Sequence, residues 1–139
     1  MVGKELTSLE KITIARKVAD ALVYMHDIKV DAKRVMHRDI RVANVLLTDK
    51  LEPMLTGFEL WAYYGPTSAA EESIKRWWAP ERILNFETSQ ETDVCSFGVL
   101  MYEISTGKEP ELSADLVGLE GNRICAKYTA LMQKCLHRY

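Results

Sequence analysis

The segment from about residue 89 to residue 105 restricts the fold most, because it is apolar on most of its helical faces. Its apolar members are Val94, Cys95, Phe97, Val99, Leu100, Met101 and Ile104. A helix that is hydrophobic on most sides has to be buried. Thr88 and Glu91 have capping-box spacing at its start, and Gly107 stands where the C-terminal cap belongs. With 47% hydrophobic residues, the chain of 139 residues has enough apolar side chains for a core.

Two amphipathic segments are expected to form further helices. The first, over residues 8–27, has a stripe at i, i+3 and i+4 spacing that consists of Leu9, Ile12, Ala15, Val18, Ala19, Leu22, Val23 and His26. Thr7 and Glu10 predict a capping box at its start. The last stripe comprises Ile124, Tyr128, Leu131, Met132 and Cys135, with Asn122 as the expected N-cap. The fold class predicted from these patterns is mainly α.

Shorter elements are expected between the helices. Residues 28–34 are charged and typical of a turn, whereas residues 45–47 and 54–55 predict a small β-hairpin. Residues 57–88 contain glycines and prolines without a sustained period, which predicts one long loop.

Charge and cysteine usage exclude several classes of function. A formal net charge of −2 without a basic stripe argues against a nucleic-acid partner. The three cysteines (Cys95, Cys125 and Cys135) form neither a disulfide framework nor a zinc motif. The sequence has no signal peptide and no apolar run of the ~18 residues that a membrane span needs. The expected location is therefore cytoplasmic.

The most informative motif is HRDIRVAN, from His37 to Asn44, which resembles the catalytic loop of protein kinases at every fixed position. The resemblance implies that Asp39 orients and deprotonates a hydroxyl group, and that Arg41 places a cation near the transferring phosphate. Asn44 would supply an oxygen ligand to Mg²⁺. ATP and Mg²⁺ are the implied cofactors, and a protein substrate or a regulatory protein is the implied partner.

Two further motifs follow in the order of the kinase family. Ala79-Pro80-Glu81 resembles the A-P-E that ends the activation segment, and residues 93–99 (DVCSFGV) resemble the buried helix that follows it. The resemblance to the kinase C-terminal lobe extends from Leu6 to Arg138. It implies a helical lobe with a small hairpin beside the catalytic loop and a long activation segment. Residues 1–139 would then form a partial kinase domain that lacks the N-terminal lobe.

The resemblance extends to a subgroup. Arg41-Val42-Ala43 is similar to the R-A-A of tyrosine kinases, and residues 76–81 (RWWAPE) are similar to their K-W-x-A-P-E. Tyr63 and Tyr64 resemble tandem activation-loop tyrosines. These features predict the tyrosine-kinase group and phosphorylation of protein tyrosines.

The sequence also departs from the family pattern. Gly57-Phe58-Glu59 stands where kinases carry D-F-G, so the metal-binding aspartate has become a glycine. The sequence has no G-x-G-x-x-G and no V-A-x-K to bind phosphates. The arginine that pairs with the A-P-E glutamate in the family has no counterpart, so Glu81 would cost stability if it were buried without a partner.

Each motif residue also has a structural interpretation. His37, Asp39 and Asn44 can serve to hold the loop in shape, and Arg38 can either receive a phosphotyrosine or tie two loops together. Asp93 is expected to accept backbone hydrogen bonds from the catalytic loop. Three functions therefore remain open: a tyrosine-kinase-like enzyme, a pseudokinase that acts as a binding or regulatory module, and a fragment without independent function. The expectation for this chain is that it does not catalyse phosphoryl transfer.

Overall fold

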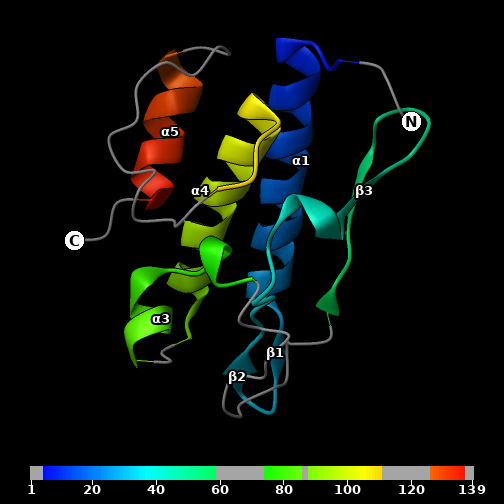
Figure 1. The fold of residues 1–139 in the computed structure, drawn as a ribbon. Coiled ribbons are helices and arrows are strands. Elements are labelled where there is room, and N and C mark those ends of the chain that lie inside the picture. The colour runs from blue at the N-terminus through cyan, green and yellow to red at the C-terminus, as the bar shows by residue number, and fades with distance from the viewer. Residues whose placement is uncertain (1–4, 59–73, 86–87, 111–125, 137–139) are drawn as a thin grey trace.

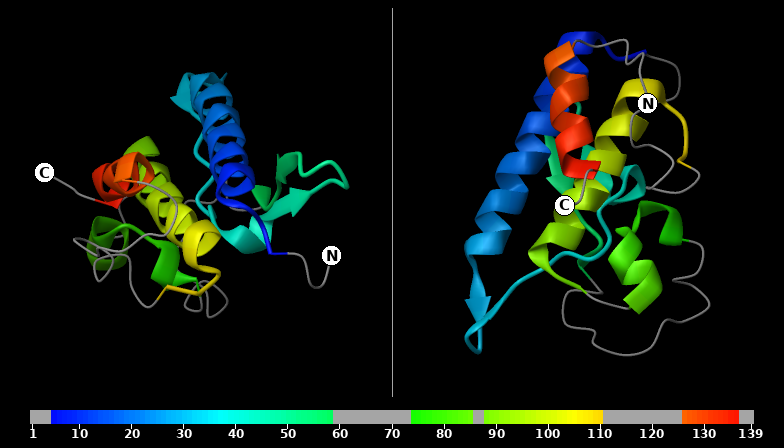
Figure 2. Two further views of the ribbon diagram at one scale, coloured as in Figure 1. Left: turned by 90° about the horizontal axis from the view of Figure 1, so that it is seen from above. Right: turned by 90° about the vertical axis from the view of Figure 1, so that its left-hand side faces the viewer.

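Three helices lie side by side at the centre of the molecule. The computed structural model describes residues 5–58, 74–85, 88–110 and 126–136. Helix α4 (Gln90–Thr106) lies between α1 (Ser8–Asp27) and α5 (Ala126–Leu136), and contacts both (Figures 1 and 2). The short helix α3 (Pro80–Asn85) lies near the N-terminal end of α4 (Figure 1). The predicted fold class, mainly α, is confirmed.

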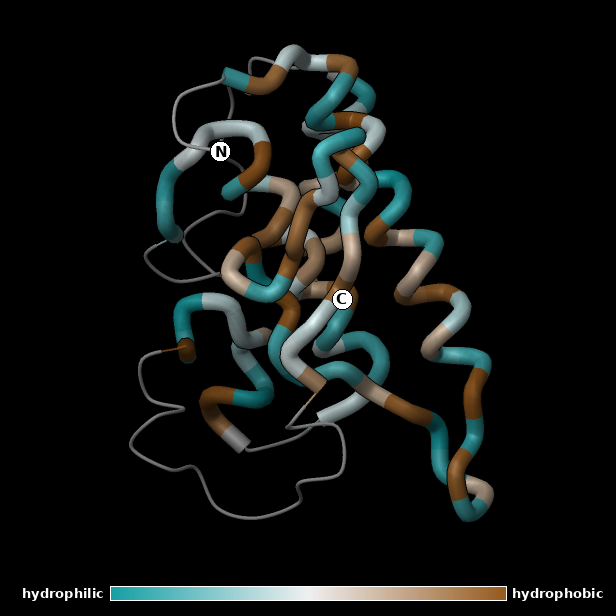
Figure 3. The backbone as a smooth tube through the Cα atoms, turned by 90° about the vertical axis from the view of Figure 1, so that its right-hand side faces the viewer, coloured by the Kyte–Doolittle hydropathy of each residue, from teal (hydrophilic) through white to brown (hydrophobic). Residues whose placement is uncertain are grey.

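Helix α4 is the buried element that its composition predicts. Its buried apolar members are Cys95, Phe97, Val99, Leu100 and Met101, and the core that they form includes Val18, Leu22, Trp77, Trp78 and Met132. Val94 departs from the expectation, since 42% of its surface is exposed. Helix α1, by contrast, is amphipathic, and hydrophobic and hydrophilic residues alternate along it (Figure 3). None of the described helices is long and apolar enough to cross a bilayer.

The helix caps confirm two predictions and correct a third. Helix α1 begins with the predicted capping box, in which the Glu10 N–H donates to Thr7 Oγ1 and the Thr7 N–H donates to Glu10 Oε2. Gly107 caps α4 with a φ of +68°, as predicted. At the start of α4, however, the capping box uses Ser89 and Thr92 rather than Thr88 and Glu91. Thr88 Oγ1 instead accepts a hydrogen bond from the Arg38 side chain.

The predicted hairpin is present as strands β3 (Val45–Leu47) and β4 (Pro53–Leu55), which pair antiparallel. Leu46 faces Met54 across the pair. A second antiparallel ribbon, β1 (Lys29–Val30) and β2 (Lys33–Arg34), lies within the expected turn. The expected long loop is also more structured than its sequence suggests, because the 3₁₀ turn η3 (Lys75–Trp77) and helix α3 lie within it.

Gly98 sets the distance between α4 and α5. A Cβ atom at this position would lie 2.9 Å from Cys135 Cβ and 3.0 Å from Leu136 Cγ. Gly98→Ala is therefore expected to lower the free energy of unfolding by about 1–3 kcal/mol, the usual cost of overpacking a core. Urea denaturation measures this change. The exposed Val94→Ala on the same helix is the control and should change stability by less than about 0.5 kcal/mol. Equal effects of the two substitutions would contradict the close contact.

Candidate active site

Asp93 anchors the loop from His37 to Asn44 to the central helix. Its side chain is 1% exposed. Oδ2 accepts hydrogen bonds from the backbone N–H of His37 (2.7 Å) and from His26 Nε2 (2.9 Å), and Oδ1 accepts one from the backbone N–H of Arg38 (2.8 Å). Arg38 has a φ of +72°, a left-handed conformation that is uncommon for a residue with a side chain. The predicted acceptor role of Asp93 agrees with these contacts, which hold the strained backbone in place.

His37 connects this loop to the segment after β4. Its side chain is completely buried. The backbone N–H of Asp39 donates to His37 Nδ1 (3.1 Å), so the ring proton has to be on Nε2, which then donates to the carbonyl oxygen of Thr56 (2.7 Å). The ring also contacts that of Phe58, with 4.8 Å between the centroids. His37 therefore contacts both neighbours of Gly57, through the carbonyl oxygen of Thr56 and the ring of Phe58.

Arg38 ties the loop to two other segments. Its guanidinium group donates to Thr88 Oγ1 (2.9 Å), immediately before α4. Its carbonyl oxygen accepts a hydrogen bond from Arg82 of α3, whose guanidinium carbon lies 3.8 Å from the ring centroid of Trp78. These contacts agree with the interpretation of Arg38 as a residue that joins loops. Glu81, in the first turn of α3, is half-buried and has an interaction partner, while its buried Oε1 atom accepts no hydrogen bond from the described residues.

Asp39, Arg41 and Asn44 come together in one cluster. Arg41 Nε donates to Asp39 Oδ1 (2.8 Å), and Asn44 Nδ2 donates both to Asp39 Oδ2 (2.7 Å) and to the Asp39 carbonyl oxygen (2.8 Å). The Arg41 guanidinium carbon also lies 5.8 Å from the ring centroid of Trp77. The Asp39 side chain is 11% exposed. Both of its carboxylate oxygens are therefore engaged by neighbours in the same loop.

Gly57 lies directly against this cluster. Its φ is +81°, and a Cβ atom there would lie 2.4–2.7 Å from three side-chain atoms of Asn44. The Asn44 side chain thus fills the space into which a side chain at position 57 would project. Phe58 is 44% exposed, although its ring contacts His37. Glu59, Tyr63 and Tyr64 lie outside the described residues.

Comparison with known proteins identifies the family of the chain. A sequence model of the family described as "Protein tyrosine and serine/threonine kinase" matches residues 2–137. The chain belongs to the protein kinase family. The predicted kinase C-lobe-like fold is thereby confirmed, and the role of the segment from His37 to Asn44 as the catalytic loop remains a prediction.

Similar proteins include several plant kinases of Arabidopsis thaliana. The chain is 33% identical over 109 residues to "Receptor-like cytosolic serine/threonine-protein kinase RBK2" (74% of this chain, 23% of that protein). It is 36% identical over 112 residues to "Lectin-domain containing receptor kinase VI.3" (78% and 16%) and 34% identical over 116 residues to "Calmodulin-binding receptor-like cytoplasmic kinase 1" (78% and 24%). The chain thus spans at most about a quarter of the length of these relatives.

These names bear on the predicted subgroup. RBK2 is named as a serine/threonine kinase, as are three G-type lectin S-receptor-like kinases of Arabidopsis thaliana that are 31–32% identical to the chain, and the family description includes both acceptor types. The chain is therefore a protein kinase family member without an assigned acceptor, and the tyrosine-kinase group remains a prediction.

The side chains of this site offer Mg²⁺ one oxygen ligand fewer than the kinase pattern does, because position 57 is a glycine. Protein-bound Mg²⁺ in kinases is held by carboxylate and amide oxygens together with the phosphates of the nucleotide. Gly57 offers no side chain, and the amide nitrogen of Asn44 is directed at Asp39 by two hydrogen bonds. In the described part of the chain, no group of three or more His, Cys, Asp or Glu residues is placed to hold a metal ion. Because Nδ2 is turned towards Asp39, Oδ1 is the Asn44 atom left to face a cation, and Asn44 as a metal ligand remains a prediction.

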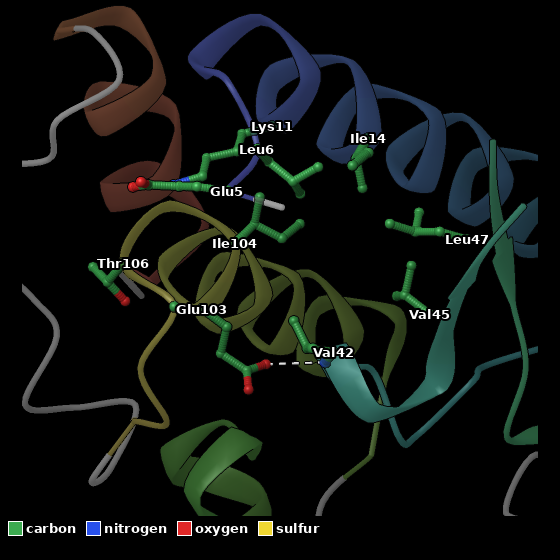
Figure 4. A pocket seen from close by; sticks show the side chains of 11 residues that line it. Glu5, Leu6, Lys11, Ile14, Val42, Val45, Leu47, Glu103, Ile104 and Thr106 are labelled. Carbon is green, nitrogen blue, oxygen red and sulfur yellow. Dashed lines mark hydrogen bonds between the residues drawn. The ribbon is translucent and has the colours of Figure 1, made fainter. Parts of the chain in front are cut away.

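Glu103, a buried carboxylate that contacts the loop from His37 to Asn44, is not among the residues predicted from the sequence. Glu103 is 8% exposed, and its Oε2 accepts a hydrogen bond from the backbone N–H of Val42 (3.0 Å; Figure 4). Burial raises the pKa of Glu103, while the Val42 N–H and Trp77 act in the opposite direction. The available signal was a lone acidic residue near the C-terminal end of an otherwise apolar helix.

The raised pKa of Glu103 predicts a pH dependence of stability. The native state binds this proton more tightly than the unfolded state, so the contribution of Glu103 to stability falls as the pH rises from the ordinary glutamate pKa of 4.5 through the native pKa. Glu103→Gln removes this proton equilibrium. The unmodified chain loses this contribution as the pH rises and the variant does not. The free energy of unfolding of the variant minus that of the unmodified chain should therefore increase between about pH 4 and pH 7. Urea denaturation across this range tests the sign, and a constant difference would contradict it.

Proposed function

We propose that this chain is a pseudokinase-type module, which uses the kinase fold to bind a protein partner and does not transfer phosphate. The observation that carries this proposal is the contact between Gly57 and Asn44. In place of a second metal-binding side chain, the site has a glycine whose neighbouring space is filled by Asn44. The remaining carboxylate, Asp39, is engaged by Arg41 and Asn44.

Glycine in place of the metal-binding aspartate at position 57 matters because of the chemistry of phosphoryl transfer. Mg²⁺ neutralises negative charge on the β- and γ-phosphates, and little else in a kinase can replace it. The sequence of this chain also contains neither a glycine-rich loop nor the V-A-x-K lysine that pairs with phosphates. The glycine at position 57 and the missing phosphate-binding motifs both support weak binding of Mg²⁺-ATP by this chain.

Thermal unfolding in the presence of nucleotide tests the proposal. Titration with ATP, with and without Mg²⁺, should leave the Tm of the 139-residue chain unchanged. A site filled at 100 times its Kd would stabilise the chain by about 2.7 kcal/mol, which is a shift of several degrees. A Mg²⁺-dependent increase of this size would overturn the proposal. The exposed Asp49→Asn variant is a control for nonspecific effects of charge.

A catalytically active kinase is the second candidate, and the cluster of Asp39, Arg41 and Asn44 favours it. In this alternative, Asp39 accepts the proton of the acceptor hydroxyl and Arg41 stabilises charge on the phosphate. Transfer of a radiolabelled γ-phosphate to a protein substrate, abolished by Asp39→Asn, would support this alternative and contradict the module. Phosphoamino acid analysis of the product would then test the predicted tyrosine acceptor against serine and threonine.

The proposed location of the module is the cytoplasm. Two of the relatives are named as a receptor-like cytosolic kinase and a receptor-like cytoplasmic kinase, which supports this location. The proposed partner is a protein, because the family acts on proteins and the charge balance of the chain disfavours nucleic acid.

A further inference from the structure

A pocket of about 340 Å³ lies outside the Asp39 cluster, between the start of α1, the end of α4 and the segment from Val42 to Leu47 (Figure 4). Its volume is within the range of about 300–1,000 Å³ that small-molecule sites occupy in proteins. Most of its wall is apolar and is formed by Leu6, Ile14, Val45, Leu47 and Ile104. These side chains come from three separate elements and would surround a hydrocarbon or aromatic group.

Glu103 places a carboxylate in this apolar wall. More than nine-tenths of its surface is buried, and the Val42 N–H donates to its Oε2. Burial of a carboxylate costs free energy unless charge or hydrogen bonds compensate for it. The raised pKa of Glu103, caused mainly by burial, is consistent with incomplete compensation.

The pocket is lined by two carboxylates, Glu5 and Glu103, and by one ammonium group, that of Lys11. The ammonium group of Lys11, which also lines the pocket, donates to the carbonyl oxygen of Ser105 (3.2 Å). Arg41, whose charge acts on Glu103 only weakly, donates to Asp39. Glu5 at the rim of the pocket and Glu109 nearby add negative charge. The charged side chains that line the pocket therefore sum to a formal charge of −1, which favours a ligand with a positive group.

We propose that this pocket binds a small amphipathic amine, whose apolar body packs between α1, α4 and β3 and whose ammonium group pairs with Glu103. The site would be independent of the nucleotide site, because it uses none of the side chains of Asp39, Asn44 or Gly57. It would still be connected to the catalytic loop, since the same Glu103 carboxylate holds the Val42 N–H at the start of the 3₁₀ turn η1 (Val42–Asn44).

The test compares 4-phenylbutylamine with its neutral analogue 4-phenylbutan-1-ol, by NMR titration of the ¹⁵N-labelled 139-residue chain. The amine is expected to bind about tenfold or more tightly than the alcohol, because a charge-assisted hydrogen bond contributes more than a neutral one. It should shift the amide signals of Val42 and Ile104. Equal affinities for the two compounds, or no shift at Val42 and Ile104, would overturn the proposal.

Three variants identify which side chains of the pocket bind the amine. Glu103→Gln keeps an acceptor for the Val42 N–H and should reduce the affinity for the amine to that for the alcohol. Asp49→Asn changes the net charge equally at an exposed residue that does not line the pocket, and should leave both affinities unchanged. Leu47→Ala, at a residue 39% exposed, should weaken binding of both compounds without unfolding the chain. Unchanged affinities in Leu47→Ala would overturn the proposal even if Glu103→Gln failed to fold.

Discussion

Replacement of Asp93 by alanine is expected to lower the free energy of unfolding by about 3–5 kcal/mol, the largest effect of any single substitution considered for this chain. The variant loses the acceptor for two backbone N–H groups, those of His37 and Arg38, and for the His26 ring. The Asp93 site is 1% exposed, so water cannot readily replace the lost acceptors. The free energy of unfolding in urea measures the change.

Two controls separate the hydrogen bonds from other effects. Asp93→Asn keeps one acceptor oxygen but turns an NH₂ group towards a backbone N–H, so its loss should be intermediate. Asp49→Ala removes an exposed carboxylate and should change the stability by less than about 0.5 kcal/mol. If Asp93→Ala were as mild as Asp49→Ala, Asp93 would not be the anchor of the catalytic loop.

Gly57→Ala is expected to have the second largest effect, a loss of about 2–4 kcal/mol. Strain at a φ of +81° contributes about 1–2 kcal/mol. Displacement of the Asn44 side chain, 2.4 Å from the new Cβ, would break its hydrogen bonds to Asp39 at about 1 kcal/mol each. Gly107→Ala is a matched control, because Gly107 has a φ of +68° and no neighbouring atom within 4 Å. It should therefore show the strain alone.

A double-mutant cycle tests the steric conflict directly. In an Asn44→Ala background the new methyl group at position 57 has room, so Gly57→Ala should cost only the backbone strain. The expected coupling between the two positions is about 1–2 kcal/mol, as is usual for residues in contact. Additive effects would show that Asn44 does not fill the space beside Gly57. The proposed absence of a second metal-binding side chain would still follow from the glycine itself.

The helices and the hairpin could be predicted because their signals are local. The 3.6-residue stripe and the Thr7–Glu10 box specify α1, and the apolar faces of α4 specify its burial. The N-cap of α4 is Ser89 rather than the predicted Thr88. Thr88 Oγ1 accepts a hydrogen bond from Arg38, which lies 50 positions away and is not visible in the local pattern. The short elements η3 and α3 were missed because they depend on packing against the core, not on periodicity.

The candidate site was only partly predictable. The kinase motif identified His37, Asp39, Arg41 and Asn44, and the structure places the last three in direct contact. The motif could not reveal that Asn44 occupies the space beside Gly57, because the two residues are 13 positions apart and meet only in the folded chain. Glu103 was missed for the same reason, since its partner Val42 is distant in sequence.

The attachment of the loop to Asp93 has a consequence for its dynamics. The segment from His37 to Asp39 has an irregular backbone, and loops of this kind usually move independently of the core. Its amide groups, however, are held by a side chain of the central helix and by the buried ring of His37. Local opening of this segment would require the N-terminal half of α4 to separate from it. In its motions the segment therefore behaves as part of the core, although its shape is that of a loop.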